Sequence, residues 1–201
     1  EQIYSGRVEF EDPYRMYSAA TQYRYAPREG TLLKIYAQYD RTDFSNYEGD
    51  ARRLFDLGED NAYVNATFRR NTSAGWNWFA GAAYSFYEQK IGNAVSEGDH
   101  WMERQQELHT KAKVAKRLSP VLRMDAGAEN FLRRYANSYR IDAVNSRNRL
   151  SPTVSAAFLS GTYYPIEQLK TELSFRVEHT SPNNHTTFSP RLAANYYWGN
   201  M

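Results

Sequence analysis

Apolar and polar side chains alternate at period two along almost the whole chain, and no other feature of the sequence limits the fold so strongly. The clearest stretch is 107–118, where Leu108, Thr110, Ala112 and Val114 alternate with His and Lys. A period of two is typical of β-strands with one apolar and one polar face, and almost no stretch has the period of an amphipathic helix. The sequence therefore predicts an all-β protein.

Turn residues divide this pattern into strands. We expect strands at 3–10, 16–25, 32–43, 62–70, 76–89, 107–118, 121–135, 154–164 and 169–178, with a last one after Ser189. Short turns lie at 26–30, 71–75, 119–120 and 165. Four stretches are longer and polar, and we expect them to be loops: 44–61, 90–106, 136–152 and 179–189. Short and long connections thus alternate along the chain.

This alternation places all long loops at one end of the sheet, as in bacterial outer-membrane barrels, whose turns are short on the periplasmic side and longer outside. The mean hydropathy of -0.78 excludes a helical membrane bundle, and no run approaches the roughly 20 apolar residues of a spanning helix. We therefore expect an antiparallel, up-and-down transmembrane β-barrel domain over 1–201, multi-pass in the outer membrane of a Gram-negative bacterium, with extracellular loops. A soluble β-sandwich is an alternative.

Aromatic residues gather at the short-turn ends of the expected strands. Rings at one end of successive hairpins are typical of the girdle where a barrel meets lipid headgroups. The alternative is a set of cross-strand aromatic pairs in a soluble barrel. The predicted girdle residues are Tyr23, Tyr25, Trp76, Trp78, Tyr196 and Trp198.

The polar face of the strands would line the barrel lumen. We expect these residues to form a hydrogen-bonded wall, and contact with a ligand or a plug is the more specific hypothesis. The predicted lumen-facing residues are Arg69, His109, Lys111, Lys113, Arg117, Asp125, Glu129, Arg176, Glu178, Arg191 and Asn195.

The hairpin at Ser119-Pro120 allows a register prediction. Directly paired residues point the same way, so a strict two-residue loop would put Leu108–Leu118 and Leu122–Ala128 on opposite faces. A loop longer by three residues sets Lys113 opposite Glu129 and Arg117 opposite Asp125, with complementary charges. Lys116 interrupts the apolar face near the turn, where its ammonium can reach the headgroups.

No catalytic or metal-binding pattern is recognisable. His100, His179 and His185 are expected in loops and His109 on a polar face, without the spacing of a zinc site. There is no Cys, and the net charge of +2 argues against nucleic acid as a partner. We expect no enzyme, cofactor or metal. A barrel hydrolase using Asp40 and His109 is the least favoured alternative.

The last third of the chain contains a recognisable pattern. "SAAFLSGTYYPIEQLKTELSFRVEHT" followed by "TTFSPRLAANYYW" resembles the barrel of TonB-dependent outer-membrane receptors. The matching residues are Ala156, Ala157, Phe158, Tyr163, Arg176 and Glu178, then the motif Phe188, Ser189, Pro190, Arg191, Leu192, and Tyr196. Ser174 stands where the family commonly has Gly. The first two-thirds of the chain share with the family only the general pattern of aromatic-rich hairpins with long connections.

The resemblance implies a barrel of about 22 strands, of which this chain would supply about ten, with the N-terminal plug domain absent from it. Its partners would be outer-membrane lipid, the rest of the barrel and plug, TonB acting through that plug, a surface lipoprotein, and a siderophore, cobalamin, saccharide or peptide. We therefore expect a segment of an energy-coupled uptake receptor. The alternative is a structural or binding barrel without transport, including a small closed ten-stranded one.

Overall fold

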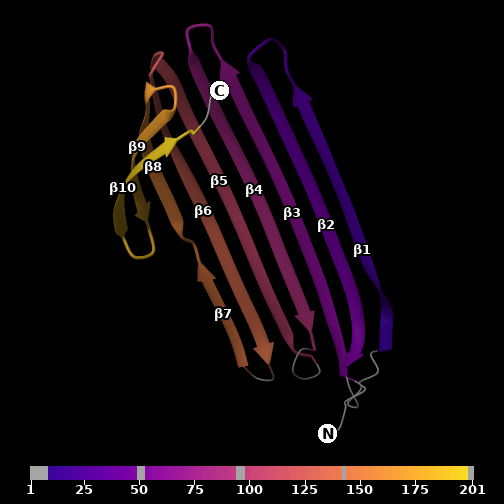
Figure 1. Cartoon of the computed structure of the whole chain (residues 1–201). Coiled ribbons are helices and arrows are strands. Elements are labelled where there is room, and N and C mark those ends of the chain that lie inside the picture. The colour runs from indigo at the N-terminus through magenta and orange to yellow at the C-terminus, as the bar shows by residue number, and fades with distance from the viewer. Residues whose placement is uncertain (1–8, 49–52, 94–97, 142–143, 199–201) are drawn as a thin grey trace.

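The computed structural model describes residues 9–48, 53–93, 98–141 and 144–198, and these residues form one antiparallel sheet of ten strands (Figure 1). The strands are β1 Glu9–Tyr25, β2 Thr31–Glu48, β3 Arg53–Asn71, β4 Trp76–Gly92, β5 His100–Ser119, β6 Leu122–Ile141, β7 Val144–Leu150, β8 Thr153–Ile166, β9 Leu169–Thr180 and β10 His185–Tyr196. The all-β, antiparallel, up-and-down prediction is confirmed. Among the described residues there is no helix that could cross a membrane.

Neighbours in the chain are neighbours in the sheet, except that β7 and β8 both pair with β6. Ser151 and Pro152 separate the two, and the Arg133 N–H donates to the Pro152 carbonyl across this break at 3.0 Å. β9 pairs with β8 but not with β7, so β7 projects beyond β8–β10 (Figure 1). Figure 1 shows β1–β6 side by side as a broad ribbon, with β8–β10 curling round at one edge.

The four ranges predicted as loops are mostly strand, and that part of the prediction is wrong. Within 44–61, β2 continues to Glu48 and β3 begins at Arg53. In the same way 90–106, 136–152 and 179–189 lie largely in hairpins of β4–β5, β6–β7 and β9–β10. The predicted strand 3–10 lies mainly outside the described residues, and residues 9 and 10 belong to β1. An extracellular position of these hairpins stays a prediction.

The β5–β6 hairpin keeps the apolar residues of both strands on one face by means of a bulge, which the sequence did not predict. Ser119 pairs with Leu122, so Pro120 and Val121 form a two-residue loop, and a bulge between Arg117 and Ser119 absorbs one residue. Lys113 therefore faces Gly127 rather than Glu129. Arg117 faces Arg123 rather than Asp125, so both predicted pairs are wrong by two residues, although all four partners share one face.

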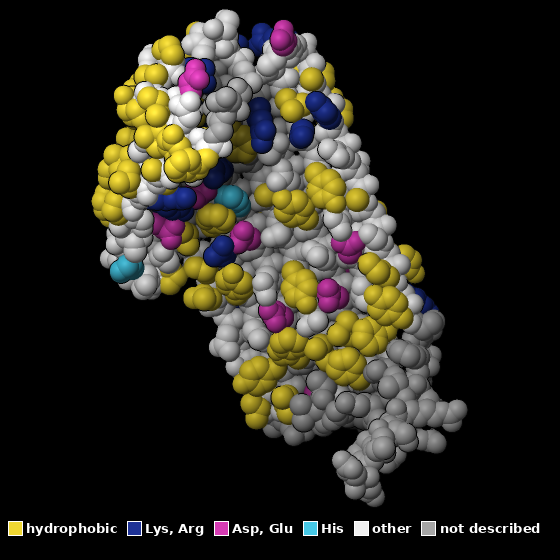
Figure 2. Space-filling view, viewed as in Figure 1, with side chains coloured by type: hydrophobic (Ala, Val, Ile, Leu, Met, Phe, Trp, Pro, Cys, Tyr) yellow, Lys and Arg dark blue, Asp and Glu magenta, His cyan; other side chains and the backbone are white. Residues whose placement is uncertain are grey.

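The sheet has an apolar face and a polar face, and it has no dry core. Among the described residues the only buried hydrophobic ones are Ala115 and Ala156, both on the polar face. Large apolar side chains on the other face are open: Phe68 is 39% exposed and Leu192 73%. Figure 2 shows Lys, Arg, Asp, Glu and His on the concave side and hydrophobic groups over the outside of the curl. Such a face requires an apolar environment.

The apolar side chains of successive strands form a band on the apolar face, and this band crosses the sheet obliquely. The row of directly paired residues that starts at Tyr25 on β1 reaches Phe188 on β10, but the aromatic residue at the short-turn end of β10 is Tyr196, eight residues further on. The band thus shifts by about one residue per strand, which corresponds to a tilt of about 35° at spacings of about 3.3 Å per residue and 4.8 Å per strand. Strands of membrane barrels tilt by roughly 35–45°.

The other border of the band shifts at the same rate. Tyr39 on β2 and Val177 on β9 are the last apolar residues before Arg41 and His179. The row of Val177 meets β2 at Leu33, six residues before Tyr39. On β4 the band runs from Trp76 to Phe86, about 33 Å along the strand and about 27 Å along the membrane normal at this tilt. That height matches the band of about 25 Å on outer-membrane barrels.

Candidate functional site: a charged concave face

The register places all the predicted lumen-facing residues on one face. They occupy β3, β5, β6, β9 and β10, and direct pairing across these strands connects their positions. Their function as a lumen wall, or as contacts to a ligand or plug, stays a prediction. The residues are Arg69, His109, Lys111, Lys113, Arg117, Asp125, Glu129, Arg176, Glu178, Arg191 and Asn195.

Glu129 is the centre of the first ion-pair group. Its carboxylate, only 9% exposed, lies 3.1 Å from the Lys111 ammonium and forms an ion pair with Arg176 from β9. Arg176 also donates to Glu178 at 2.8 Å. The His109 Nε2 lies 3.7 Å from Glu129. Three strands, β5, β6 and β9, are thus connected through charges on one surface.

Asp125 is the centre of the second group. The Arg123 guanidinium donates to both of its carboxylate oxygens, at 3.0 and 3.1 Å, and the Lys113 ammonium lies 3.1 Å away. The predicted charge complementarity across this hairpin is therefore realised, but Lys113 pairs with Asp125 and Lys111 with Glu129. Arg123 was missed, although its position two residues before Asp125 puts it on the same face.

The remaining predicted cations lie toward the short-turn end. Arg69 stands over the Phe79 ring at 5.6 Å, Arg117 pairs with Arg123, and Arg191 pairs with Ser174. No carboxylate of the described residues is within 4 Å of these three guanidiniums. Asn195 lies opposite Lys170. This end of the face therefore carries an excess of positive charge.

Aromatic rings lie between the charges, which sequence reasoning missed. His109 stacks on Phe131 with ring centroids 3.9 Å apart, and the Lys111 ammonium lies 5.5 Å from the Phe158 ring. Tyr36 and Tyr63 form a further pair at 6.1 Å. The signal was a Phe or Tyr at a polar-face position of its strand. Rings and charges together form a surface that can bind a polar organic ligand or a plug.

The structure does not bring together the pair considered for hydrolysis. Asp40 on β2 and His109 on β5 share the concave face, but β3 and β4 lie between them. Asp40 accepts hydrogen bonds from Ser18 at 2.5 Å and from Gln38 at 2.7 Å. The buried His109 Nε2 has no hydrogen-bond partner among the described residues. Those residues also include no group of three or more His, Asp or Glu that could hold a metal ion.

The predicted girdle residues with described strand positions lie on the apolar face at the short-turn end. Tyr23 and Tyr25 stack at 6.3 Å, and Trp76 and Trp78 at 5.9 Å. Tyr196 meets Trp198, just beyond β10, edge to face at 5.0 Å. Lys116 pairs directly with Trp76 and places its ammonium 4.5 Å from that ring.

The motif residues 188–192 alternate between the two faces of β10. Phe188 stacks on Phe175 at 5.8 Å on the apolar face. Ser189 pairs with Arg176, which connects the motif to the first ion-pair group. Pro190 lies opposite Phe175. Among the described residues β10 pairs with β9 alone, and an edge strand of this kind tolerates a residue without an N–H.

The strands are tilted, the antiparallel meander has one apolar and one polar face, and the apolar band is exposed. Together these features define a section of a transmembrane antiparallel β-barrel. The solved structure of the copper transporter OprC is similar to this chain with a TM-score of 0.65 and 10% identity, over 90% of this chain and 34% of that chain. The translocator domain of autotransporter NalP from Neisseria meningitidis is similar with a TM-score of 0.44 and 15% identity, over 93% of this chain and 71% of that chain.

The chain thus spans about a third of the length of the copper transporter. The likeness to that transporter shows the fold, that of an outer-membrane β-barrel, and the sheet of this chain is not closed. No protein-family model and no curated protein matches the sequence.

Proposed function

We propose that this chain is a barrel section of an outer-membrane receptor that takes up a scarce ligand with energy supplied through TonB. The single observation that carries the proposal is the two-sided surface of the tilted sheet. One side is a band of membrane height, and the other carries two groups of ion pairs with aromatic rings between the charges. The motif at 188–192 supports the receptor family within the class of barrels.

The charged face supports contact with a plug or with a polar ligand. Glu129 and Asp125 each have two cationic partners, and Arg176 also pairs with Glu178, so most charged groups around them are ion-paired within the wall. Balanced charges suit a packed plug surface, whereas the excess cations at Arg69, Arg117 and Arg191 suit an anionic or carboxylate-bearing group.

The outer edges of β1 and β10 have no strand partner among the described residues. An unpaired strand edge is not tolerated in hydrocarbon, because its N–H and C=O groups would stay unsatisfied. We propose that further strands of the same receptor pair with these two edges and close the barrel.

The proposal is tested by uptake in cells that lack the gene. Deletion and wild-type strains are compared for uptake of labelled ferric siderophore, cobalamin, maltooligosaccharide and oligopeptide at nanomolar supply, with and without a functional TonB. We expect loss of uptake for one of these ligands, of the same extent in the deletion strain and in the strain without TonB.

Complementation with a Glu129→Gln, Asp125→Asn double variant and with a Leu192→Ala control separates the charged face from the apolar face. We expect only the double variant to lower uptake at equal surface abundance. Unchanged uptake of every ligand in the deletion strain contradicts the receptor proposal and favours a structural or binding barrel without transport.

A further inference from the structure

Five arginines lie on the convex face of the sheet, which is the face that carries the apolar band, and they lie immediately beyond that band. Leu108 and Leu132 pair directly and are the last residues of the continuous apolar run of β5 and β6 on this face; beyond them only Met102 and Ala136 are apolar. The next rows across β5, β6 and β7 are Gln106–Arg134, Arg104–Ala136–Arg149, Met102–Ser138–Arg147 and His100–Arg140–Asn145. We call Arg104, Arg134, Arg140, Arg147 and Arg149 the basic surface.

Its positive charge is largely uncompensated. No acidic residue lies on the convex face of β5, β6 or β7 in these four rows. Arg134, Arg147 and Arg149 are exposed, and none has a carboxylate of the described residues within 4 Å. Arg104, at the rim, pairs with Glu88 on β4, with a hydrogen bond of 2.6 Å. Arg140 donates to the Gly98 carbonyl at 3.3 Å.

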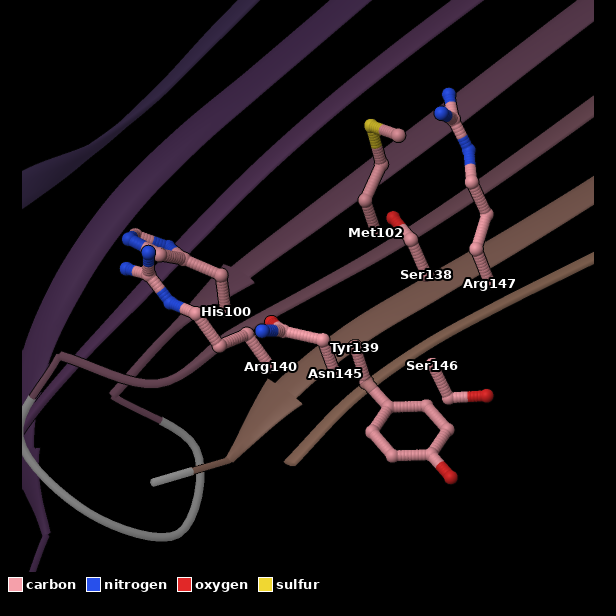
Figure 3. Close-up of a pocket in the computed structure, with 8 residues that line it drawn as sticks. All are labelled: His100, Met102, Ser138, Tyr139, Arg140, Asn145, Ser146 and Arg147. Carbon is pink, nitrogen blue, oxygen red and sulfur yellow. The ribbon is translucent and has the colours of Figure 1, made fainter. Parts of the chain in front are cut away.

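Two hollows adjoin the basic surface. One, of about 350 Å³, is lined in part by Arg104, Arg134, Arg147 and Arg149. The other, of about 430 Å³, is lined in part by His100 and Arg140 (Figure 3). In Figure 3, Met102, Ser138 and Arg147 project from one side of the sheet, while Tyr139 and Ser146 point to the other. Both hollows are partly open at the surface, and each includes at least two of the five arginines.

Protection of a strand edge explains only part of this cluster. β7 has one edge without a strand partner among the described residues, and charged side chains on such edges discourage pairing with other chains. That reason applies to Arg147 and Arg149. It does not apply to Arg104, because β5 is paired on both sides along these rows. Arg134 lies at the break between β7 and β8 rather than on the free edge of β7.

We propose that the basic surface binds the phosphate-bearing headgroup of a glycolipid in the leaflet that covers this end of the strands. The inference rests on the proposed outer-membrane location. A lipid whose acyl chains lie along the apolar band has its headgroup at the level of Arg134, Arg104 and Arg149. Guanidinium forks match phosphate oxygens bidentately and form stronger hydrogen bonds than neutral donors. Continuity with the apolar band favours a lipid over a soluble anion as occupant.

The test measures binding of lipid A, a diphosphorylated glycolipid, to the full-length protein purified in a zwitterionic detergent, by native mass spectrometry. The variant is R134Q/R147Q/R149Q. The matched control, R24Q/R28Q/R70Q, removes the same charge at the short-turn end. Each Lys or Arg near an anionic membrane surface contributes about fivefold in affinity, so we expect about a 100-fold loss for the variant and little change for the control. Phosphatidylcholine serves as the zwitterionic reference lipid, and inorganic phosphate as the soluble anion.

Equal lipid A binding by the variant and the wild type overturns the proposal. So does inorganic phosphate binding as tightly as lipid A, because the site would then select a soluble anion. If the triple variant does not fold, R149Q alone keeps the test valid, with an expected loss of about fivefold. Binding is measured without transport, so failure here leaves ligand uptake and its TonB dependence as a separate result.

Discussion

Gly127 on β6 is the position where one added methyl group should perturb the sheet most. It lies on the concave face between Lys113 on β5 and Phe158 on β8. A Cβ built on Gly127 would lie 2.5 Å from the Ala112 carbonyl oxygen and 2.9 Å from Phe158 Cε1, and would overlap Phe158 Cζ. The Phe158 ring thus covers a backbone site that has no room for a side chain.

The two contacts differ in how they can relax. The Phe158 ring can rotate away, but it would then lose its packing over the strand and its place 5.5 Å from the Lys111 ammonium. The Ala112 carbonyl belongs to β5, which is paired on both sides, so it cannot shift without disturbing the ladder. Overpacking of this kind typically costs 1–3 kcal/mol, and a backbone contact places Gly127→Ala near the upper end, at about 3 kcal/mol.

Gly161→Ala is the matched control. Gly161 lies on the opposite face, and its added Cβ would meet only the Met124 side chain, with Sδ at 3.2 Å. A thioether adapts at little cost, and Ala favours a strand over Gly by roughly 0.5–1 kcal/mol. We therefore expect Gly161→Ala to change the free energy of unfolding by less than about 1 kcal/mol in either direction.

The assay is urea unfolding of the protein folded in detergent micelles, followed by Trp fluorescence and by heat-modifiable mobility on gels. The double variant Gly127→Ala/Phe158→Ala separates the two contacts, because it removes the ring and keeps the carbonyl. We expect Gly127→Ala to lower the midpoint strongly and the double variant not to restore it. Wild-type stability of Gly127→Ala, or full recovery in the double variant, would falsify the assignment of the cost to the backbone contact.

Two further predictions address the apolar band and the hairpins beyond it. Leu159 is 46% exposed on the apolar face, so Leu159→Arg should destabilise the protein in a bilayer by about 2–4 kcal/mol. In the control Ser160→Arg, the new side chain faces Asp125 across the sheet, and the cost should be less than about 1 kcal/mol. Equal folding yields of the two variants in phosphatidylcholine vesicles would contradict the lipid-facing assignment. Beyond the band, the Lys90 ammonium and, after it, the Arg104 guanidinium hold the pKa of Glu88 below its usual range against the effect of burial. A lowered folded-state pKa stabilises the hairpin above the unfolded-state pKa, and this stabilisation is lost as the pH falls through the folded-state pKa. Because intrinsic amide exchange itself slows in acid, the quantity to measure is the protection factor. In the outer half of β4–β5 it should fall below about pH 4 in the wild type and not in Glu88→Gln.

The faces of the strands could be predicted because the apolar alternation exists wherever one face meets lipid. It assigned Arg69 and Asn195, which are far apart in the chain, to the same surface as Glu129. The same reasoning failed beyond the band. There Arg104, Asp60 and Arg147 occupy the convex face, so both faces are polar and the alternation disappears although the hydrogen-bonded ladder continues.

The ion-pair partners could not be predicted to the residue, because register depends on the turn. The bulge before Ser119 adds one unpaired residue to β5, and the alternation of apolar and polar residues does not reveal it. It changes the partner of Lys113 from Glu129 to Gly127 and moves its ion pair to Asp125. The opposite charges tolerate either register, since long Lys side chains reach diagonal neighbours as well as direct ones. Charge complementarity therefore identified the hairpin surface but not its register.

The oblique course of the apolar band is the strongest physical argument for a bilayer around this sheet. A soluble sheet that packs on a second layer has no reason to displace its apolar residues steadily from strand to strand. A bilayer is a flat slab, and strands tilted through a slab meet its two borders at successively shifted positions. Both borders here shift at about one residue per strand, from Tyr25 to Tyr196 on one side and from Tyr39 to Val177 on the other, so the band keeps its thickness. A strand that pairs with the free edge of β10 should therefore begin its apolar face about one residue beyond the row of Tyr196, and a straight continuation of that row would contradict the slab.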